Sequence, residues 1–345
     1  MLITFTLIAV ISTALLWFAK PSPEYMLWAL IFVGIGNFAF ESGMVFYNSM
    51  LPDITEDNAI GRVSGWSWGL GYAGGLVCLS LALIAFVQTD NPWFGVGKEQ
   101  AAHIRATAIL VAVWFLLFAV PLFIFTPDRD SRGVKYSFAI LDGISSTFKT
   151  LKHLDKSLLR YLIARMLYSD GLTTLFAFGG IYAAGTFGFS FSEIILFGIA
   201  INVTAGVGAI SFAWIDDLLG SKLTILVSLT ALILLSTTLL IVETKLYFWL
   251  FGLSLGTFVG PVQSASRSLM AHMAPVGLRT EMFGLYAFSG KATSFLGPAA
   301  LAYITDLFQN QRLGMATIIL FLLMGALLLL LVENPNSRLQ SKKIV

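Results

Sequence analysis

The stretch G-R-V-S-G-W-S-W-G-L-G, at Gly61–Gly71, decides how this chain is organised, because a similar stretch follows later. The later stretch is R-T-E-M-F-G-L-Y-A-F-S-G, at Arg279–Gly290. A shift of 219 positions (284 minus 65) aligns Gly65 with Gly284 without a gap, and it also aligns a second glycine and an upstream serine. Parallel repeats of this kind build the two halves of many transporters. The chain therefore contains two related halves.

The composition places both halves in a membrane. Hydrophobic residues make up 57% of the 345 residues, charged residues make up 12%, and the mean hydropathy is +0.84. Soluble domains carry about 25% charged residues, so this chain lacks the polar surface that water requires. The one cysteine, Cys78, cannot form an intrachain disulfide, and the three histidines show no metal-ligand spacing. We expect no metal and no cofactor.

Ten apolar stretches are long enough to cross about 30 Å of hydrocarbon as helices. They lie at 2–19, 26–48, 63–87, 105–125, 158–182, 192–214, 222–242, 246–270, 282–304 and 314–332. None alternates in the way that barrel strands do, so the predicted fold class is all-α. The first stretch lacks the basic start and small-residue cleavage site of a signal peptide, and we interpret it as a spanning helix.

Lysine and arginine in the connecting segments predict the orientation. One set of loops, together with the C-terminal tail, holds thirteen of these residues, and the opposite set holds five. The richer side is expected to be cytoplasmic, which also places the C-terminus there. We expect a multi-pass protein of the plasma (inner) membrane.

The longest loop divides the chain into four helices and six. The predicted organisation is an N-terminal bundle at 1–125, a cytoplasmic linker at 126–157, a six-helix bundle at 158–332 and a cytoplasmic tail at 333–345. Within the linker, apolar residues recur at helical spacing between Phe138 and Leu154, among lysines. This pattern is typical of an amphipathic helix on the membrane surface, and a plain linker explains it nearly as well. If the halves are equivalent, the repeat leads us to expect two further helices before Met1.

The segment from Asp217 through Gly220 to Lys222 joins the sixth and seventh predicted helices. It resembles the D-x-x-G-x-[RK] turn of the major facilitator superfamily. The resemblance implies a gating turn in which the acid and the base help to lock neighbouring helix ends. An ordinary turn with an acid at a helix N-terminus is the alternative.

Longer motifs make the resemblance more specific. They are F-Y-N-S-M-L-P-D (46–53), G-R-V-S-G-W-S-W-G-L-G (61–71), R-M-L-Y-S-D-G (165–171), Q-S-A-S-R-S-L-M (263–270) and F-G-L-Y-A-F-S-G-K (283–291). Together they resemble the vacuolar-effluxer-like branch of the major facilitators, which is related to the autophagy-linked amino-acid effluxer of fungi. The resemblance covers essentially the whole chain, and it implies a fold of two helix bundles. It departs at the front, where the family's usual first helix and first D-x-x-G-R turn are not found.

Ionisable residues inside apolar stretches are costly and tend to mark substrate or proton pathways. Glu41 and Asn48 share one face of the second predicted helix, while Arg165 and Asp170 lie on the fifth. We expect these four to lie on a substrate or proton pathway. An ion pair between Glu41 and Arg165 is a candidate gate. Glu41 is alternatively a structural acid that caps or pairs with a neighbouring helix, and Asp170 is alternatively a packing residue. Lys291, near the middle of the ninth helix, is the strongest candidate because it cannot reach water there.

Gln263 at the end of the eighth helix is a further pathway candidate, and nearby Arg267 is expected to pair with a lipid phosphate or a loop. Gly260 and Pro261 can interrupt that helix, as happens near transporter sites. Three glycines at four-residue spacing are interpreted as close helix packing with no substrate role. They are Gly61, Gly65 and Gly69.

The combined expectation is a secondary active transporter that moves a small organic solute by alternating access. Amino-acid efflux is what the family resemblance implies, and protons are the expected coupling ion. We expect a monomer in the lipid bilayer, with no nucleic-acid partner and no enzymatic activity. A non-transporting remnant or scaffold stays open, whereas a membrane enzyme would need a catalytic His, Asp or Ser cluster that the sequence does not show.

Overall fold

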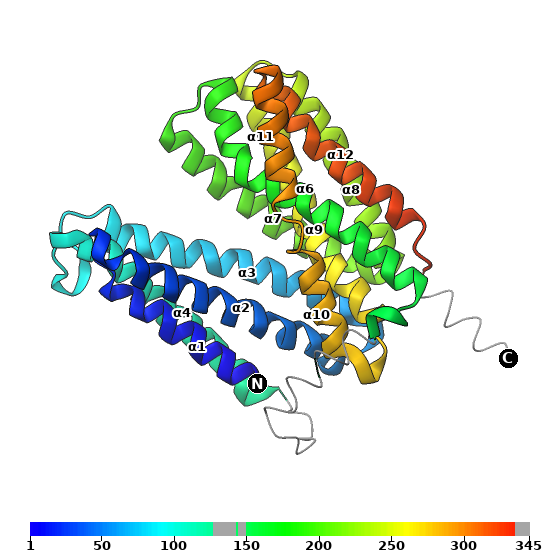
Figure 1. The fold of residues 1–345 in the computed structure, drawn as a ribbon, viewed down its shortest axis with the longest axis horizontal. Coiled ribbons are helices and arrows are strands. Elements are labelled where there is room, and N and C mark those ends of the chain that lie inside the picture. The colour runs from blue at the N-terminus through cyan, green and yellow to red at the C-terminus, as the bar shows by residue number, and fades with distance from the viewer. Residues whose placement is uncertain (127–142, 144–149, 335–345) are drawn as a thin grey trace. The chain divides into compact units, whose positions relative to one another are not determined.

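The computed structural model describes residues 1–126, 143 and 150–334 (Figure 1). Every regular element in these residues is helical, which confirms the all-α class. The helices are α1 (Leu2–Leu15), α2 (Met26–Ile54), α3 (Ile60–Ala82), α4 (Ala102–Phe125), α6 (Lys156–Phe187), α7 (Phe191–Leu219), α8 (Ser221–Ile241), α9 (Lys245–Met273), α10 (Arg279–Ser289), α11 (Leu296–Phe308) and α12 (Gln311–Leu330).

Much of the helical surface is apolar. Within the described ranges, 7 helices are long and apolar enough to cross a membrane. Large side chains such as Leu234, Leu246 and Leu327 are more than half exposed on these helices. Water would penalise such continuous apolar exposure, whereas lipid tails accept it. The chain is therefore a multi-pass integral membrane protein, and the number of crossings stays a prediction.

Helix contacts divide the chain into two compact units, and boundaries fall inside α2 between Met50 and Leu51 and inside α3 between Ala73 and Gly74. Unit 1 comprises residues 1–50 and 74–134, and unit 2 comprises 51–73 and 135–345. In unit 1, α1 packs along α4. The domain organisation expected from the 126–157 linker stays a prediction. The amphipathic helix expected between Phe138 and Leu154 falls largely outside the described residues.

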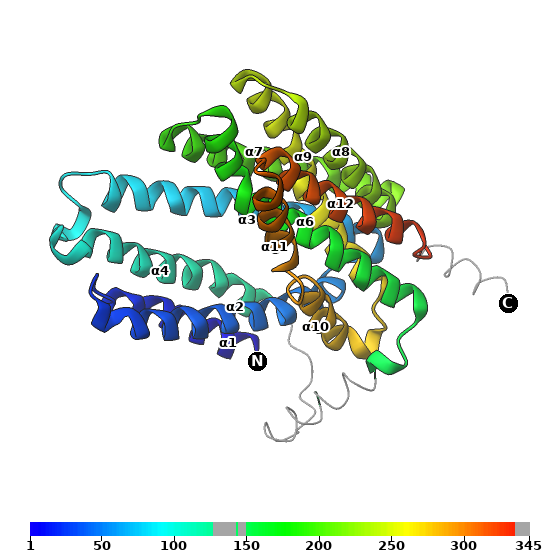
Figure 2. The same ribbon diagram turned by 45° about the horizontal axis from the view of Figure 1, so that its top comes forward.

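Unit 2 contains the helices that carry most of the candidate residues. Helix α9 packs against both α7 and α8, and α6 packs along α12 (Figure 2). Local capping explains where several of these helices begin. The Ser190 side chain accepts a hydrogen bond from the Glu193 N–H, and Glu193 accepts one from the Ser190 N–H, so a capping box starts α7. Gly188, with φ of 65°, ends α6 in the left-handed region that glycine adopts without strain.

The prediction of one continuous helix at 282–304 was wrong. The stretch 282–304 forms α10 and α11 with a non-α junction at 290–295, and Figure 2 shows them as separate segments. Most backbone bonds in the junction join residues three apart, as in Leu296 N–H to the Thr293 carbonyl. Pro298 then falls in the first turn of α11, where its missing N–H is not needed. We call this segment the α10–α11 junction.

Candidate functional site

Helix α3 approaches α7 closely because three glycines face it. A Cβ atom on Gly65 would lie 2.5 Å from the Ala209 carbonyl oxygen and 2.6 Å from the Ala213 Cβ. A Cβ on Gly69 would collide with Ile210, and one on Gly61 would collide with the acids at the end of α7. Any side chain at these positions would push the two helices apart. The glycines thus bring the start of α3 within hydrogen-bonding reach of α7.

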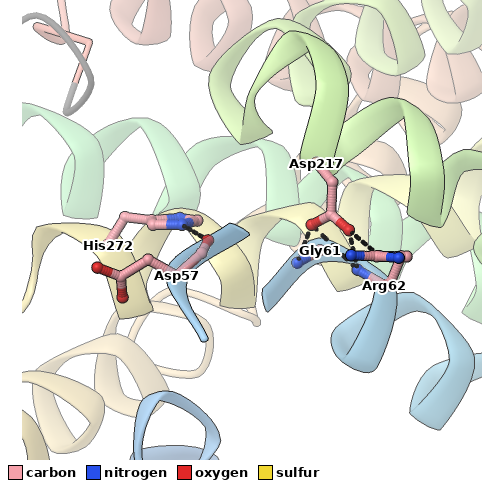
Figure 3. Close-up of polar contacts among 5 residues, drawn as sticks. All are labelled: Asp57, Gly61, Arg62, Asp217 and His272. Atoms are coloured by element: carbon pink, nitrogen blue, oxygen red, sulfur yellow. Dashed lines mark hydrogen bonds and ion pairs between the residues drawn. The ribbon is translucent and has the colours of Figure 1, made fainter. Parts of the chain in front are cut away.

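Asp217 uses that proximity to cap α3 (Figure 3). Its Oδ1 accepts a hydrogen bond of 2.8 Å from the Gly61 N–H, and both oxygens lie 3.3 Å from the Arg62 backbone N. The Arg62 Nε donates to Oδ2 at 2.7 Å. A carboxylate at a helix N-terminus satisfies backbone N–H groups that have no partner in the helix and favours the helix dipole. Asp217 therefore ties α7 to the first turn of α3.

Lys222 makes the complementary contact at the other side of the same turn. Its Nζ donates to the Leu330 carbonyl at 3.0 Å and to the Val332 carbonyl at 2.5 Å, at the C-terminal end of α12. A cation at a helix C-terminus is favourable for the same dipole reason. Between the two charges, Gly220 has φ of 89°, which only glycine adopts without strain. The turn thus contacts one helix start and one helix end.

Helix α9 joins α3 through a buried arginine. The Arg267 Nε donates to the Ser64 Oγ at 2.9 Å, and its Nη2 donates to the Ser64 carbonyl at 2.8 Å and to the Ser67 hydroxyl. Arg267 is only 4% exposed, so the expected contact with a lipid phosphate was wrong. The Ser64 hydroxyl in turn donates to the Ser264 carbonyl at 2.8 Å. An arginine is well suited to this position because its planar group holds several acceptors at once.

Three further polar contacts extend the same α3–α9 face. The Tyr72 hydroxyl donates to the Gln263 Oε1 at 2.5 Å. The His272 Nε2 lies 3.2 Å from the Asp57 carbonyl, as Figure 3 shows. At the first residue of α10, the Arg279 Nη1 donates to the Asp53 carboxylate at 2.5 Å. We call the contacts of residues 53–72 with α7, α9 and Arg279 the polar seam.

Helix α6 carries the second group of charged contacts. The Arg165 Nη1 donates to the Tyr286 carbonyl at 2.5 Å and to the Ser289 Oγ at 2.9 Å, and the guanidinium lies 3.5 Å from the Tyr286 ring centre. The Gly290 N–H also donates to the Tyr286 carbonyl, but this hydrogen bond is long, at 3.4 Å. A Cβ on Gly290 would lie 2.5 Å from the guanidinium. Arg165 therefore binds the C-terminal end of α10.

Asp170 binds the other end of the junction. Both of its carboxylate oxygens accept from the Gly297 N–H at 3.2 Å, in the first turn of α11. Asp170 is 1% exposed, and a Cβ on Gly297 would collide with Asp170 and Thr174. The Arg165 cation at the end of α10 and the Asp170 anion at the start of α11 both have the charge that the helix dipole favours. Interrupted helices of this kind occur near transporter binding sites.

The remaining candidates lie apart from these contacts. Lys291 is exposed and lies in the α10–α11 junction itself, rather than inside a continuous helix. Glu41 and Asn48 lie on α2 in unit 1 and are partly buried. The expected ion pair of Glu41 with Arg165 joins the two units and stays a prediction. The structure thus brings Arg165 and Asp170 to one junction, and Asp217 and Gln263 to one seam.

Sequence reasoning did not select the serines of the seam or Asp216. Ser64 and Ser67 look like ordinary small residues in a glycine-rich helix, although their spacing of three puts them on one helical face. Asp216 directly precedes the motif acid, and an acid pair at a helix end resembles a solvated terminus. Its burial, at 4% exposed, is the feature that the sequence alone does not carry.

Solved structures define the class of this fold. The chain aligns with a major facilitator transporter, FucP, in the outward conformation with a TM-score of 0.72 and 14% identity, over 96% of this chain and 82% of FucP. The human organic anion transporter MFSD10 aligns with a TM-score of 0.69 and 16% identity, over 95% and 76% of the two chains. At such low identity the alignments establish the fold alone. The chain has the major facilitator fold.

The sequence comparisons then identify the family. The family model described as "Vacuole effluxer Atg22 like" matches residues 1–342, so the chain belongs to this family. The Bacillus subtilis "Uncharacterized MFS-type transporter YxiO" is 25% identical over 95% of this chain and 76% of its own length. "Autophagy-related protein 22" of Kluyveromyces lactis is 23% identical over 88% of this chain. The chain spans 66% of that yeast relative and 50% of a Cryptococcus neoformans relative.

Proposed function

We propose that the chain is a secondary active transporter that moves a small organic solute by alternating access. In this proposal the polar seam is the gate that closes one side of the pathway. The excess of lysine and arginine in the loops on that side favours a cytoplasmic location for the gate. The plasma membrane is the proposed location of the protein. The family description, as an effluxer, favours export, and the fungal relatives favour amino acids among the solutes.

The single observation that carries this proposal is the capping of α3 by Asp217. Stable contacts between membrane helices combine close packing at small residues with interhelical hydrogen bonds. Here the glycine packing is combined with four polar contacts at the helix end, and Arg62 is 45% exposed there. The Asp217 side chain is only 10% exposed, but the Arg62 end of the ion pair is open to water, and such pairs contribute about 1 kcal/mol or less. Such a contact can break and reform at little cost, which a gate requires.

The α10–α11 junction is the proposed substrate-facing element. Its carbonyl and N–H groups, together with Lys291, offer hydrogen-bonding groups to a polar solute, and Gln263 and Asp170 lie in the same unit. In the proposal, Glu41 and Asn48 supply polar groups from unit 1. A solute with both an amino and a carboxyl group could use the acidic and the basic side chains together.

A flux experiment tests the proposal. The purified full chain is reconstituted into liposomes loaded with a mixture of the common amino acids and small organic acids. Loss of each solute is followed by mass spectrometry, with and without an imposed pH gradient. We expect at least one solute to leave faster than from protein-free liposomes. If no solute leaves faster under either condition, the transporter proposal is wrong.

A matched pair of variants tests the proposed substrate-facing junction. Lys291→Ala removes the junction cation, whereas Lys20→Ala removes a cation outside the proposed pathway. We expect Lys291→Ala to reduce the flux at least about tenfold, equivalent to about 1.4 kcal/mol of transport barrier, and Lys20→Ala to leave it unchanged. Equal flux in the two variants would remove Lys291 from the pathway.

A further inference from the structure

Asp216 and Asp217 are neighbours on α7, but only Asp217 makes hydrogen bonds of ordinary geometry. Asp216 is 4% exposed, and neither of its carboxylate oxygens has a hydrogen-bond partner among the described residues. When ionised, this carboxylate is therefore buried with no direct ion pair among the described residues, and its neighbours are the Ser221 and Ser268 hydroxyls and the His272 ring. Removing a carboxylate from water without a partner costs several kcal/mol. A folded protein that keeps such a group either neutralises it or binds a cation beside it.

A second orphaned group lies across the α7–α8 turn. The Ser221 hydroxyl is also buried without a hydrogen-bond partner, and the Ser268 hydroxyl of α9 is close to the Asp216 carboxyl group. Asp216 and Ser221 both line a cavity of about 910 Å³ within unit 2. One carboxylate and two hydroxyls are hard oxygen donors. Such donors suit a small cation, and the negative charge of the carboxylate disfavours an anion.

The basic groups nearby are bonded elsewhere. His272 of α9 faces Asp216, but its ring contacts the Asp57 carbonyl. Lys222 of α8 bonds two carbonyls at the end of α12, and Arg62 of α3 bonds Asp217. The wider cavity wall carries five more charged or titratable side chains. These are Asp57, His153, Asp155, Arg279 and Glu333.

We propose that Asp216, with the hydroxyls of Ser221 and Ser268, binds a small monovalent cation, either a proton or a sodium ion. A divalent metal is a poor fit, because the described part of the chain contains no group of three His, Cys, Asp or Glu side chains placed to hold one. A sodium ion would take the oxygen donors directly. A proton would neutralise the carboxyl group and let it donate to a serine hydroxyl.

The position of the site links it to the seam. A Cβ atom on Gly61 would lie 2.8 Å from the Asp216 Cγ, so this carboxyl group packs directly against the helix start that Asp217 caps. A bound cation removes a like charge beside Asp217 and favours the closed contact between α3 and α7. Binding of the cation is independent of transport, whereas its role as a coupling ion rests on the proposed function.

Thermal unfolding of the purified full chain in detergent tests the site without any transport assay. One arm compares sodium chloride with choline chloride at pH 8 and equal ionic strength. The other arm lowers the pH from 8 to 5.5 in choline chloride. We expect the midpoint of unfolding, Tm, to rise by about 3 °C or more in at least one arm, because a ligand that binds only the folded state stabilises it. A rise in the sodium arm identifies sodium, and a rise in the pH arm alone identifies a proton.

Variants tie the response to this carboxylate. Asp216→Asn should raise Tm at pH 8 in choline and abolish the response, whereas the exposed-acid control Glu24→Gln should keep it. Ser221→Ala keeps the charge, and it should raise the sodium concentration at half-response about tenfold, or shift the midpoint of the pH response. Ser221→Ala therefore tests the site even if Asp216→Asn fails to fold. A flat response in both arms, or an unchanged response in Asp216→Asn or Ser221→Ala, would overturn the proposal. If the liposome experiment showed no solute flux, a cation-dependent rise in Tm would still support the cation site.

Discussion

The α7–α8 turn and the α10–α11 junction both pair charged side chains with the ends of helices, but the two regions differ in their exposure to water. In both, an anion binds a helix start and a cation binds a helix end: Asp217 and Lys222 at the turn, Asp170 and Arg165 at the junction. At the turn the charges lie at helix ends, and Arg62 and Lys222 keep some exposure. At the junction the two side chains project from inside α6, and Asp170 is almost completely buried.

This difference in exposure predicts how much each contact contributes to the stability of the fold. A charge with access to water loses little when its partner leaves, because water replaces the partner. A buried charge has no such replacement, so removing either partner leaves an unsatisfied group in an apolar environment. We therefore expect the junction to be the more sensitive of the two regions, and the turn to open more readily.

The largest expected effect is at the junction. Asp170→Ala removes the acceptor of the Gly297 N–H and leaves a small void between α6 and α11. We expect the free energy of unfolding to fall by about 3 kcal/mol, the upper end for a hydrogen bond to a charged group. Asp170→Asn keeps an acceptor of nearly the same shape and should lose less than half as much. Thermal or denaturant unfolding in detergent measures both stability losses. Equal losses in Asp170→Ala and Asp170→Asn would show that an acceptor of the right shape is not what stabilises this contact.

The next effect tests the packing that brings the turn to α3. Gly65→Ala places a Cβ 2.5 Å from the Ala209 carbonyl oxygen, so α3 and α7 must separate. We expect a loss of about 2 kcal/mol, typical of overpacking. Gly71→Ala is the matched control on the same helix, since a Cβ there meets nothing within 4 Å. It should be neutral or stabilise by up to about 1 kcal/mol, as alanine favours helix more than glycine does. Equal losses in the two variants would contradict the close approach.

The smallest effect concerns the ion pair at the turn. Arg62→Ala and Asp217→Asn, made singly and together, form a double-mutant cycle on unfolding. We expect a coupling energy of about 0.5 kcal/mol, because the 2.7 Å contact is half exposed on the Arg62 side. The value should fall further in high salt. A coupling energy as large as the loss expected from Asp170→Ala would erase the proposed contrast between the two regions.

Much of the fold could be predicted, because apolar length reports helices directly. The predicted range 222–242 corresponds to α8 at Ser221–Ile241, within one residue at each end. The ninth range failed because its composition stays apolar through the junction, and apolarity does not report backbone winding. Gly290 and the Gly297-Pro298 pair were the available signals, since both residue types interrupt helices.

The candidate site was only partly accessible to sequence reasoning. Asp217 is recognisable because its turn is a short local motif. The partners of Arg165 and Asp170 are not, because Tyr286 and Gly297 lie 121 and 127 positions away and only tertiary packing brings them together. Asp216 and Asp217 look alike in sequence, and they differ only in what α3, α8 and α9 place around them.

The most direct measurement of gating uses Trp66 of α3 and Trp214 of α7, whose ring centres are 5.5 Å apart beside the seam. In a Cys78→Ser background, Trp66→Cys and Trp214→Cys together provide two thiols for a short reducible cross-linker, with each single variant as control. If opening of this contact is required, cross-linking should abolish solute flux from liposomes and reduction should restore it, while the single variants stay unaffected. Undiminished flux through the cross-linked protein would show that α3 and α7 do not part during transport, and the gate would have to be elsewhere.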